Sequence, residues 1–380
     1  MKVLQLGAGM VGRAIAYDLA GEATVKVTVA DFCEEALQKT AALVPVETVH
    51  ADLSDPGRLV QLAQEADLVI GALPGHMGYQ VLRHLISAGK NVVDISFFPE
   101  DPFSLQELAK EKGVTAVVDC GVAPGTSNLL AGFAASHLEH IEEVAIYVGG
   151  LPVQRFQPFE YRAPFSPVDV IEEYTRPARL VECGRLVVKS ALSDLEELEI
   201  PGVGTLEAFN TDGLRTLLHT LRADFMREKT LRYPGHAEKI RFLREVGFFS
   251  RKRLAVDGQE ISPLHLTEKL LFRHWRFRPG EEDLTVMRVS VVGSKQGRRI
   301  RYRYDLLDRA DPGTGLSSMA RCTGFMASVT ARQILQGNLQ QKGILPPEFL
   351  GRNAELFSAI FSGLKSRGLE YRESVEVLEE

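Results

Sequence analysis

The stretch MKVLQLGAGMVGRAIAYDL, residues 1–19, decides the fold of the first part of the chain. Residues 1–6 form a short apolar run suited to a strand buried on both faces, whereas residues 11–20 carry apolar side chains at helical spacing. Gly7, Gly9 and Gly12 stand at the junction in the pattern G-x-G-x-x-G. A strand, a glycine-rich turn and a helix in this order predict the phosphate-binding turn of a Rossmann-type domain, although the glycine pattern alone also fits a turn without a ligand.

Each glycine has its own physical role in such a turn. Gly7 permits the sharp change of direction, Gly9 lets the backbone approach a phosphate without an intervening side chain, and Gly12 lets the helix pack closely on the strand. Free backbone N–H groups at the start of the helix favour an anion. We therefore expect a dinucleotide pyrophosphate to bind at the loop formed by Gly7, Ala8, Gly9, Met10, Val11 and Gly12.

An acidic residue follows the second expected strand, where a Rossmann domain binds the adenosine ribose. Residues 25–30 are rich in β-branched side chains, and Asp31 comes directly after them, 19 positions beyond Gly12. A carboxylate there accepts hydrogen bonds from the ribose hydroxyls and repels a 2′-phosphate. Because Phe32 and Cys33 offer no cation for such a phosphate, the sequence predicts NAD rather than NADP as cofactor, with Asp31 and Phe32 at its ribose end.

Helices and strands continue to alternate after Asp31, which indicates right-handed βαβ crossovers. We expect helices over residues 34–42 and 57–64, and strands over residues 45–50 and 68–71. Asp52 and Leu53 follow the third strand and are expected beside the adenine of the cofactor. Alternatively, Asp52 belongs to a helix cap before Pro56.

Three later strand ends turn abruptly from apolar to polar or glycine-rich, in the strings VIGALPGHMGY, NVVDISFFPED and TAVVDCGVAPGTSNLL. In an open parallel sheet, ligands bind at the carboxyl ends of the strands. Residues 72–76, 94–98 and 119–128 should therefore line one crevice. We expect further cofactor contacts in these loops from Ala72, Leu73, Pro74 and Ser96.

The composition is that of an ordinary globular chain long enough for two cores. Of the 380 residues, 45% are hydrophobic and 25% are charged, and the net charge is −6. This acidic balance argues against a nucleic-acid partner, and no apolar run reaches the roughly 18 residues of a membrane span. The four cysteines, at positions 33, 120, 183 and 322, show no paired spacing, and no secretory leader precedes the first strand. These features predict a reduced, cytoplasmic protein without a metal site.

From about residue 144 the alternation gives way to β-rich segments with few helices between them. The strings VAIYVGGLP, GRLVVKS, LEAFNT, MRVSVVGSK and RIRYRYDLLD are typical of an antiparallel sheet. The sequence therefore predicts an α/β protein, with a doubly wound parallel sheet over residues 1–122 and a largely antiparallel α+β domain over residues 123–319. Residues 320–380 should form helices that pack back on the first domain.

A charged stretch from Gly213 to Arg253 is expected to be helical within the second domain. Its segment LRADFMREKTLR, residues 221–232, is interpreted as the solvated face of a helix. Further along, the alternation of arginine with isoleucine and tyrosine in KQGRRIRYRYD fits an exposed strand face or a subunit contact.

Several strings together resemble a known enzyme family. DCGVAPGTSNLLAG, YVGGLP, IEEYTRPA, EAFNTDGLRTLL, KTLRYPGH and SSMARCTGF are similar to segments of the saccharopine dehydrogenase-like oxidoreductases, and most of all to those of the L-lysine 6-dehydrogenases. The resemblance spans nearly the whole chain. It implies a homodimer that uses NAD to deaminate L-lysine oxidatively at the ε-amine, giving 2-amino-6-oxohexanoate, which cyclises to piperideine-6-carboxylate.

Two departures count against saccharopine chemistry. Saccharopine reductases of this family usually carry an acid after their Pro-Gly motif, as in DPGIDH, whereas APGTSN here places Ala123 and Ser127 at the acidic positions. In YVGGLP, Val148 stands where those reductases often have cysteine. The alternatives are a saccharopine- or carboxynorspermidine-type reductase and, in another class, a non-catalytic NAD-binding regulatory or scaffold protein.

Oxidation of an amine requires that its ammonium form lose a proton. Asp94 and Asp119 end neighbouring strands near the expected nicotinamide, where each could take that proton, anchor the ammonium or serve a structural role. His76 titrates near neutral pH and is either a third catalytic candidate or an exposed loop histidine. Cys120 either contacts the substrate or is buried as a small apolar residue.

The α-carboxylate of an amino-acid substrate calls for a forked guanidinium. Arg232 in TLRYPGH is the first choice, followed by Arg215 in DGLRTLL and Arg176 in YTRPA. Each of them could instead form an ion pair in the interior of the domain.

Three more residues complete the expected substrate site. His236 comes four residues after Arg232, past a Pro-Gly turn, and could face the same pocket. Asp212 could hold an α-ammonium or cap a helix at Gly213. Asn128 ends the third crevice loop and is expected to contact substrate.

Overall fold

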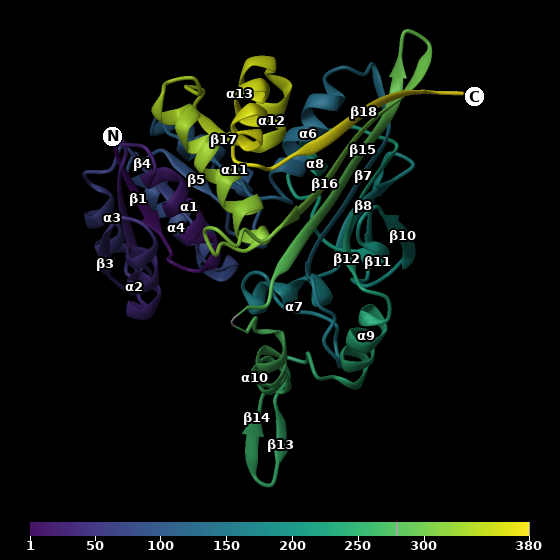
Figure 1. The fold of residues 1–380 in the computed structure, drawn as a ribbon, viewed down its shortest axis with the longest axis horizontal. Helices are drawn as coiled ribbons and strands as arrows, with labels where there is room; N and C mark the ends of the chain where they lie inside the picture. The colour runs from purple at the N-terminus through teal and green to yellow at the C-terminus, as the bar shows by residue number, and fades with distance from the viewer. Residues whose placement is uncertain (279, 380) are drawn as a thin grey trace.

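The computed structural model describes residues 1–278 and 280–379 and arranges them around two large sheets (Figure 1). The first is a seven-stranded sheet in the order β17-β6-β5-β4-β1-β2-β3, and all of its neighbouring strands are parallel. The strands are β1 (Lys2–Leu6), β2 (Lys26–Asp31), β3 (Glu47–His50), β4 (Leu68–Gly71), β5 (Val92–Asp94), β6 (Thr115–Val117) and β17 (Gly343–Leu345). The predicted doubly wound parallel sheet is confirmed.

Helices cover both faces of this sheet. They are α1 (Met10–Ala20), α2 (Glu34–Leu43), α3 (Pro56–Ala63), α4 (Gly75–Ser87), the 3₁₀ turn η1 (Pro102–Leu105) and α5 (Gln106–Glu111). Because successive strand side chains point to opposite faces, Val3 packs into one buried cluster and Leu4 into the other. The helices and strands expected over residues 34–71 all form, with boundaries that differ by at most two residues.

The strand order changes direction between β1 and β4, and this switch point sets the place of the ligand crevice. The Ala72 N–H donates to the Leu6 carbonyl at 2.8 Å, so the carboxyl ends of the two strands lie side by side. Gly7 turns the chain after β1 with φ +101°, a backbone conformation that glycine adopts without strain. Ligands of open α/β sheets bind outside the strand ends at such a point.

The second sheet has nine strands and is mostly antiparallel. Its order is β10-β11-β12-β7-β15-β16-β18, with β8 attached to β12 and β9 to β8, and the parallel pair is β12 with β7. The strands are β7 (His140–Pro152), β8 (Ala178–Glu182), β9 (Arg185–Lys189), β10 (Glu196–Ile200), β11 (Gly204–Asn210), β12 (Phe225–Arg232), β15 (Asp283–Lys295), β16 (Arg298–Arg309) and β18 (Tyr371–Leu378). The predicted second domain is confirmed, and its five β-rich strings fall in β7, β9, β11, β15 and β16.

The helical interpretation of residues 221–232 is wrong. Most of this segment is β12, a strand inside the second sheet that pairs with β7 and β11. Two of its buried charged side chains form ion pairs that offset the cost of burial: Lys229 Nζ lies 2.7 Å from a Glu196 oxygen, and Arg232 Nη2 lies 2.7 Å from a Glu173 oxygen. In the wider stretch 213–253, α8 (Leu217–Thr220) and α9 (His236–Val246) are helical.

Three further helices belong to the second half of the chain, namely α6 (Thr126–Ala135), α7 (Pro167–Thr175) and α10 (Pro263–Trp275). The small hairpin of β13 (Leu254–Val256) and β14 (Gln259–Ile261) projects from the body of the molecule next to α10 (Figure 1). One buried cluster contains Tyr174 of α7, Ile240 of α9 and Trp275 of α10. This packing holds α7 in place in the second domain. Within residues 1–278 and 280–379, no helix has both the length and the apolar character needed to cross a bilayer.

The last segment of the chain contributes to both sheets. It comprises α11 (Ser318–Leu335), β17, α12 (Pro347–Arg352), α13 (Ala354–Lys365) and β18. β17 extends the parallel sheet beside β6, whereas β18 pairs with β16 in the second sheet. Residues 320–380 therefore include two strands that the helical prediction missed.

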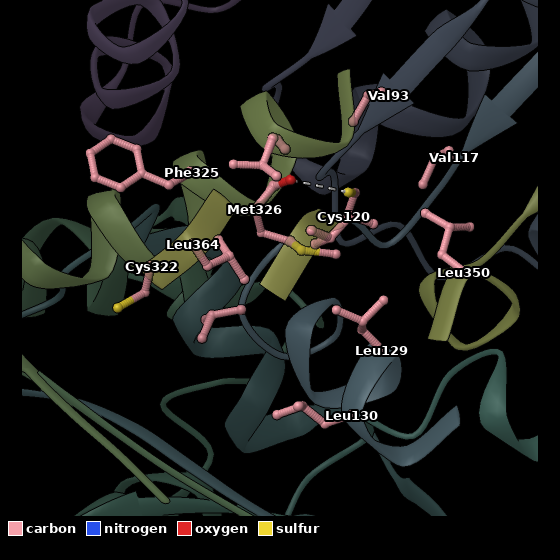
Figure 2. Close-up of a cluster of buried hydrophobic side chains, with 14 of the residues drawn as sticks. Val93, Val117, Cys120, Leu129, Leu130, Cys322, Phe325, Met326, Leu350 and Leu364 are labelled. Atoms are coloured by element: carbon pink, nitrogen blue, oxygen red, sulfur yellow. Dashed lines mark hydrogen bonds between the residues drawn. The ribbon is translucent and has the colours of Figure 1, made fainter. Parts of the chain in front are cut away.

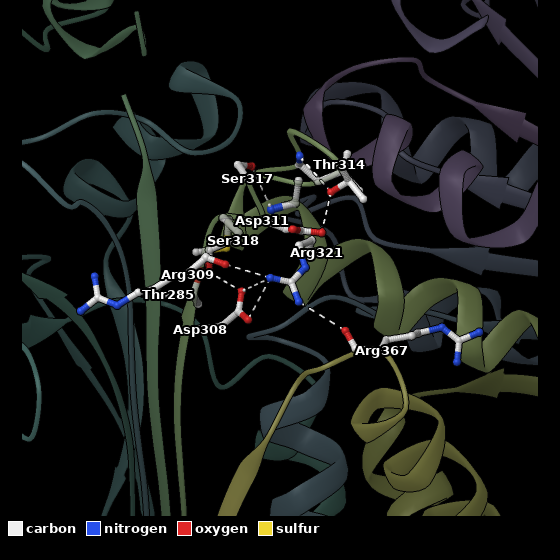
Figure 3. Close-up of polar contacts among 12 residues, drawn as sticks. Thr285, Asp308, Arg309, Asp311, Thr314, Ser317, Ser318, Arg321 and Arg367 are labelled. Atoms are coloured by element: carbon white, nitrogen blue, oxygen red, sulfur yellow. Dashed lines mark hydrogen bonds and ion pairs between the residues drawn. The ribbon is translucent and has the colours of Figure 1, made fainter. Parts of the chain in front are cut away.

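Helix α11 connects the two halves of the molecule. At its start, the Ser317 hydroxyl accepts from the Ala320 N–H, and Arg321 pairs with Asp308 of β16 at 3.1 Å (Figure 3). Towards its end, Arg332 forms ion pairs with Asp18 of α1 and with Glu22 just after that helix, and the Ser328 hydroxyl also donates to Asp18. Helix α11 therefore contacts both sheets and holds them in place relative to one another.

Helices α6 and α12 approach one another closely at two glycines. A Cβ on Gly132 would overlap the Glu348 carbonyl, and a Cβ on Gly351 would overlap the Leu129 carbonyl. We expect Gly132→Ala to lower the free energy of unfolding by about 1–3 kcal/mol, the usual effect of overpacking. Thermal unfolding measures this change, with Gly9→Ala as control because its methyl group meets no atom within 4 Å. Equal melting temperatures for the two variants would refute the close contact.

Candidate active site

A cleft of about 820 Å³ lies between the carboxyl ends of the parallel strands and the second domain. One wall contains the loops after β1, β2, β3 and β4, including Gly7 and Ala72 at the switch point. The opposite wall comes from α7 and from the ends of β7, β11 and β12. The crevice predicted at the strand ends is therefore present, and residues far apart in the sequence meet across it.

The glycine-rich turn leaves room for a ligand at one position. A Cβ on Gly7 would overlap the Ala72 carbonyl, and one on Gly12 would overlap the Gly7 carbonyl, so both glycines serve close packing. At Gly9, by contrast, a Cβ would meet no atom within 4 Å. Gly9 precedes the first residue of α1, and no side chain caps the free N–H groups there. An open space beside uncapped N–H groups fits a pyrophosphate.

The carboxylate of Asp31 lies at the end of β2 and lines the cleft. Its Oδ2 accepts the Ala8 N–H at 2.6 Å, and its Oδ1 accepts the Cys33 N–H at 2.8 Å. Two backbone donors thus hold the carboxylate beside the glycine turn. Phe32 also lines the cleft, and 75% of its surface is exposed. The chain therefore presents an acid and an aromatic face where the adenosine half of a dinucleotide would lie.

Most of the residues expected to contact cofactor line this cleft. They are Gly7, Gly9, Met10, Val11, Gly12, Asp31, Phe32, Asp52, Leu53, Ala72, Leu73 and Pro74. Two others do not. Ala8 is buried and acts through its N–H on Asp31, and Ser96 is buried with both its N–H and its hydroxyl donating to Asp94 at 3.0 Å.

Helix α7 presents a charged face to the cleft, and its three acids were not predicted from the sequence. Asp169, Glu172, Glu173 and the following Arg176 all line the cleft. Their spacing of three, four and seven residues places them on one side of the helix. That spacing in VDVIEEYTR was the pattern that could have revealed them. Helix α7 therefore contributes three acids and one arginine to the second wall of the site.

Two more carboxylates line the same wall. Asp212, which follows β11, accepts a bidentate pair from Arg179, with Nε–Oδ1 at 2.8 Å and Nη2–Oδ2 at 2.9 Å. Glu228 on β12 was not recognised as a site residue, because its segment was interpreted as a helix. It is 5% exposed, and its Oε2 accepts from the Thr211 hydroxyl at 2.5 Å and from the Gly213 N–H at 3.1 Å. Burial raises the pKa of Glu228 to about 8.

Arg232, the first choice for binding a substrate carboxylate, lines the cleft but is already occupied. Its Nη2 lies 2.7 Å from Glu173, its Nε donates to the Tyr174 hydroxyl at 3.2 Å and its Nη1 donates to the Leu231 carbonyl at 2.9 Å. The guanidinium also lies over the Tyr161 ring, 4.5 Å from its centroid. With 2% exposure it is an interior ion pair, so the prediction for Arg232 requires correction.

Arg176, unlike Arg232, has a guanidinium nitrogen that donates to no other described residue. It lines the cleft with its guanidinium 4.5 Å from the centroid of the Phe97 ring. Its Nη2 is 3.6 Å from Glu172, a loose ion pair. Its Nη1 is buried and has no hydrogen-bond partner in the described part of the chain. A buried guanidinium nitrogen without an acceptor can donate to a ligand oxygen or to a water molecule in the cleft.

Two predicted site residues form an ion pair with each other outside the cleft. Arg215 Nη2 lies 2.9 Å from Asp119, and both side chains are almost fully buried. Arg215 also donates to the Phe98 carbonyl. Because neither residue lines the cleft, the substrate role expected for Arg215 and the catalytic role expected for Asp119 are not supported by their positions.

Asp94 is likewise behind the cleft rather than in its wall. Its carboxylate is 2% exposed and accepts both donors of Ser96. Burial raises the pKa of Asp94 to about 7, but Ile95 and Phe97 of the same loop are the residues that reach the cleft. A direct catalytic role for Asp94 is therefore also corrected.

Cys120 and Asn128 are structural residues. Cys120 is fully buried among apolar side chains, with its Sγ 3.9 Å from the Met326 carbonyl (Figure 2). Asn128 is fully buried, and its amide donates to Thr216 at 3.4 Å and to Glu348 at 3.3 Å. Neither lines the cleft, so the expected substrate contacts are corrected for both.

The two histidines have opposite surroundings. His236 is 1% exposed, with Nδ1 2.9 Å from the Phe159 carbonyl and Nε2 3.0 Å from the Tyr174 hydroxyl. Burial lowers the pKa of His236 to about 3, so it is a neutral core residue and not the predicted substrate contact. His76, in the first turn of α4, is exposed and lines the cleft. It is the one of the three predicted catalytic residues that reaches the site.

Comparisons with known proteins cover almost the whole chain. The family model of the saccharopine dehydrogenase NADP binding domain matches residues 3–117, and that of the saccharopine dehydrogenase C-terminal domain matches residues 121–369. Among solved structures, the apo saccharopine dehydrogenase (L-Glu forming) of Saccharomyces cerevisiae superimposes with a TM-score of 0.81. The match covers 99% of both chains at 20% identity and shows a shared fold.

Curated relatives agree with these matches. The mitochondrial alpha-aminoadipic semialdehyde synthase of Bos taurus is 24% identical over 97% of this chain and 47% of its own length, so the chain spans about half of that relative. Saccharopine dehydrogenase [NADP(+), L-glutamate-forming] of Pyricularia oryzae is 23% identical over 98% of both chains. Carboxynorspermidine synthase of Vibrio alginolyticus is 25% identical over 92% of both. With family models over both domains, this chain belongs to the saccharopine dehydrogenase family of oxidoreductases.

Proposed function

We propose that this chain is an NAD-dependent dehydrogenase of L-lysine that oxidises the ε-amine and yields 2-amino-6-oxohexanoate, which cyclises to piperideine-6-carboxylate. The charge of the cleft carries the proposal. Its second-domain wall contains five acidic side chains and two arginines, namely Asp169, Glu172, Glu173, Asp212, Glu228, Arg176 and Arg232. Such a wall favours a substrate with two ammonium groups and disfavours one with several carboxylates.

The single available guanidinium supports the same choice. Arg232 is occupied by Glu173, which leaves Arg176 as the cleft-lining arginine with a buried donor lacking an acceptor among the described residues. L-Lysine has one carboxylate to place there, whereas saccharopine has three. Ala123, which lines the cleft, and Ser127, which is buried, also lack the acids that saccharopine reductases usually carry in this loop.

The reaction has three parts. The ε-ammonium loses a proton, the ε-carbon then loses hydride so that a C=N bond forms, and water attacks the iminium and releases ammonia. The nicotinamide supplies the hydride acceptor when it is bound. We assign Arg176 to the α-carboxylate and the acidic wall to the ammonium groups, so that the ε-carbon points towards the strand ends of the parallel sheet.

The acid at the end of β2 supports NAD over NADP, although the matching family model describes an NADP-binding domain. Asp31 would face a 2′-phosphate with a like charge, which costs on the order of 1.4–2.8 kcal/mol, or about 10- to 100-fold in affinity. We expect NAD to bind at least about tenfold more tightly than NADP, and Asp31→Ser to reduce that preference. Intrinsic fluorescence or calorimetric titration measures both dissociation constants. Tighter binding of NADP by the unaltered protein would contradict the assignment.

A substrate panel tests the activity itself. We expect NADH formation, followed at 340 nm, with L-lysine and NAD, and none with L-ornithine or saccharopine. Turnover with saccharopine alone would instead favour the saccharopine-type alternative, and turnover in the reductive direction with an aldehyde and an amine would favour a carboxynorspermidine-type enzyme. Inactivity in every assay, with NAD binding intact, would favour a non-catalytic protein.

A further inference from the structure

We propose that Glu228 accepts the proton that the substrate ε-ammonium loses. Glu228 lines the cleft, and the chain holds one of its carboxylate oxygens while the other has no hydrogen-bond partner among the described residues. This inference rests on the proposed amine oxidation and names the proton acceptor for it. Asp94, Asp119 and His76 were the candidates from the sequence, and two of them lie outside the cleft.

The position of Glu228 is fixed by the fold. It lies on β12, an interior strand paired with β7, and its Oε2 accepts the Thr211 hydroxyl and the Gly213 N–H. A Cβ on Gly213 would overlap the Glu228 carboxyl group, so the loop after β11 closes tightly on one side of it. No hydrogen bond from the described residues reaches its Oε1. A carboxylate with one oxygen anchored and the other open to a cleft can receive a proton without rearrangement.

Glu228 differs from Glu172, Glu173 and Asp212 because no cation among the described residues forms an ion pair with it. In the same wall, Glu173 pairs with Arg232, Asp212 with Arg179 and Glu172 with Arg176. No Lys, Arg or His within residues 1–278 and 280–379 forms an ion pair with Glu228. A carboxylate paired with arginine is a poor base, because the pair lowers its affinity for a proton.

The charged groups around Glu228 raise its proton affinity further. Glu173 of α7 and Asp212 of the loop after β11 face it, and both disfavour a second negative charge. Burial acts in the same direction and is the larger cause, so the pKa of Glu228 lies at about 8. This value lies between that of an ordinary carboxylate and that of the ε-ammonium, about 10.4, which suits proton transfer near neutral pH.

The bond between the ε-nitrogen and one of its hydrogens breaks, and the proton passes to Oε1 of the Glu228 carboxylate. The nitrogen lone pair that is released forms the C=N bond as the ε-carbon gives hydride to the bound NAD. The substrate is thereby oxidised by two electrons and NAD is reduced, and the carboxylic acid of Glu228 later returns its proton to water.

The test compares Glu228→Gln with Glu348→Gln. Glu348 is a matched control because it is another buried glutamate that accepts from a threonine hydroxyl, that of Thr220, but it does not line the cleft. We expect Glu228→Gln to lower kcat/KM for L-lysine by about 10²- to 10⁴-fold with the dissociation constant of NAD unchanged. Glu348→Gln should retain both values within about threefold, provided that it folds, which circular dichroism checks.

The pH profile separates proton transfer from a merely structural role. In the unaltered enzyme log kcat/KM should rise with pH and level off above about 8, because Glu228 must be deprotonated to accept a proton. Glu228→Gln should lose this rise, and formate should restore part of the activity of Glu228→Ala. An unchanged profile in Glu228→Gln, or absence of rescue by formate, would overturn the inference while leaving lysine oxidation intact. Failure of the unaltered enzyme to oxidise any amine would overturn the proposed function and this inference together.

Discussion

Gly9→Ala should fold like the unaltered protein and bind NAD at least about 100-fold more weakly. Gly9 has φ −65° and ψ −170°, which alanine adopts without strain, and a methyl group there meets no protein atom within 4 Å. The space that the methyl group would occupy is the space proposed for the pyrophosphate. Losing close contact with uncapped helix N–H groups should therefore cost about 3 kcal/mol of binding free energy. Calorimetric titration with NAD measures the affinity, and thermal unfolding confirms the fold.

Gly57→Ala is the matched control for this variant. Gly57 also lies in the first turn of a helix near the nucleotide end, but it does not line the cleft. Its substitution should leave NAD affinity unchanged. If Gly9→Ala bound NAD as tightly as Gly57→Ala does, the dinucleotide would have to approach the parallel sheet elsewhere.

Arg176→Met should raise KM for L-lysine by about 10²- to 10³-fold and leave kcat within about tenfold. The buried Nη1 of Arg176 lacks a partner among the described residues, and a carboxylate is the group that would satisfy it. Truncating one side of a buried, charged hydrogen-bonded pair costs about 2–5 kcal/mol. Steady-state kinetics with 1,5-diaminopentane provides the decisive comparison, because this diamine lacks the carboxylate. Its KM should be nearly the same for Arg176→Met and the unaltered enzyme.

Arg251→Met controls for general effects on the acidic wall. Arg251 is the other arginine paired with Glu172, and its side chain is 75% exposed outside the cleft. Its loss should change KM for L-lysine little. An equal rise in KM for both L-lysine and the diamine in Arg176→Met would show that Arg176 acts on the structure of α7 and not on the carboxylate.

The nucleotide half of the site was predictable because local rules determine it. A glycine turn after a buried strand and an acid after the next strand are set by neighbours in the sequence, so Gly9 and Asp31 could be placed directly. Ser96 was the exception among the expected cofactor contacts outside the turn. It follows a strand end like the others, but its hydroxyl donates to the buried Asp94 instead of facing the cleft.

The substrate half of the site was harder to predict from the sequence, because the tertiary fold decides which charged side chains are already paired and which can bind a substrate. Arg215 and Asp119 are 96 positions apart, and only the folded chain shows that they neutralise one another. The same holds for Arg232, whose partner Glu173 comes from a different element. Glu228 was missed because the charge pattern of its strand fits a helix until its cross-strand partners are known. A sequence pattern shows that charges are present, but it does not show which of them remain unpaired.

The most direct measurement follows deuterium from L-lysine labelled at C6. Enzyme, NAD and L-[6,6-²H₂]lysine are mixed, and the reduced nucleotide is isolated and analysed by mass spectrometry and NMR. We expect one deuterium at C4 of the nicotinamide and a lower rate than with unlabelled lysine. Deuterium transferred from lysine labelled at C2 instead, or no transfer from either labelled substrate, would contradict oxidation at the ε-carbon.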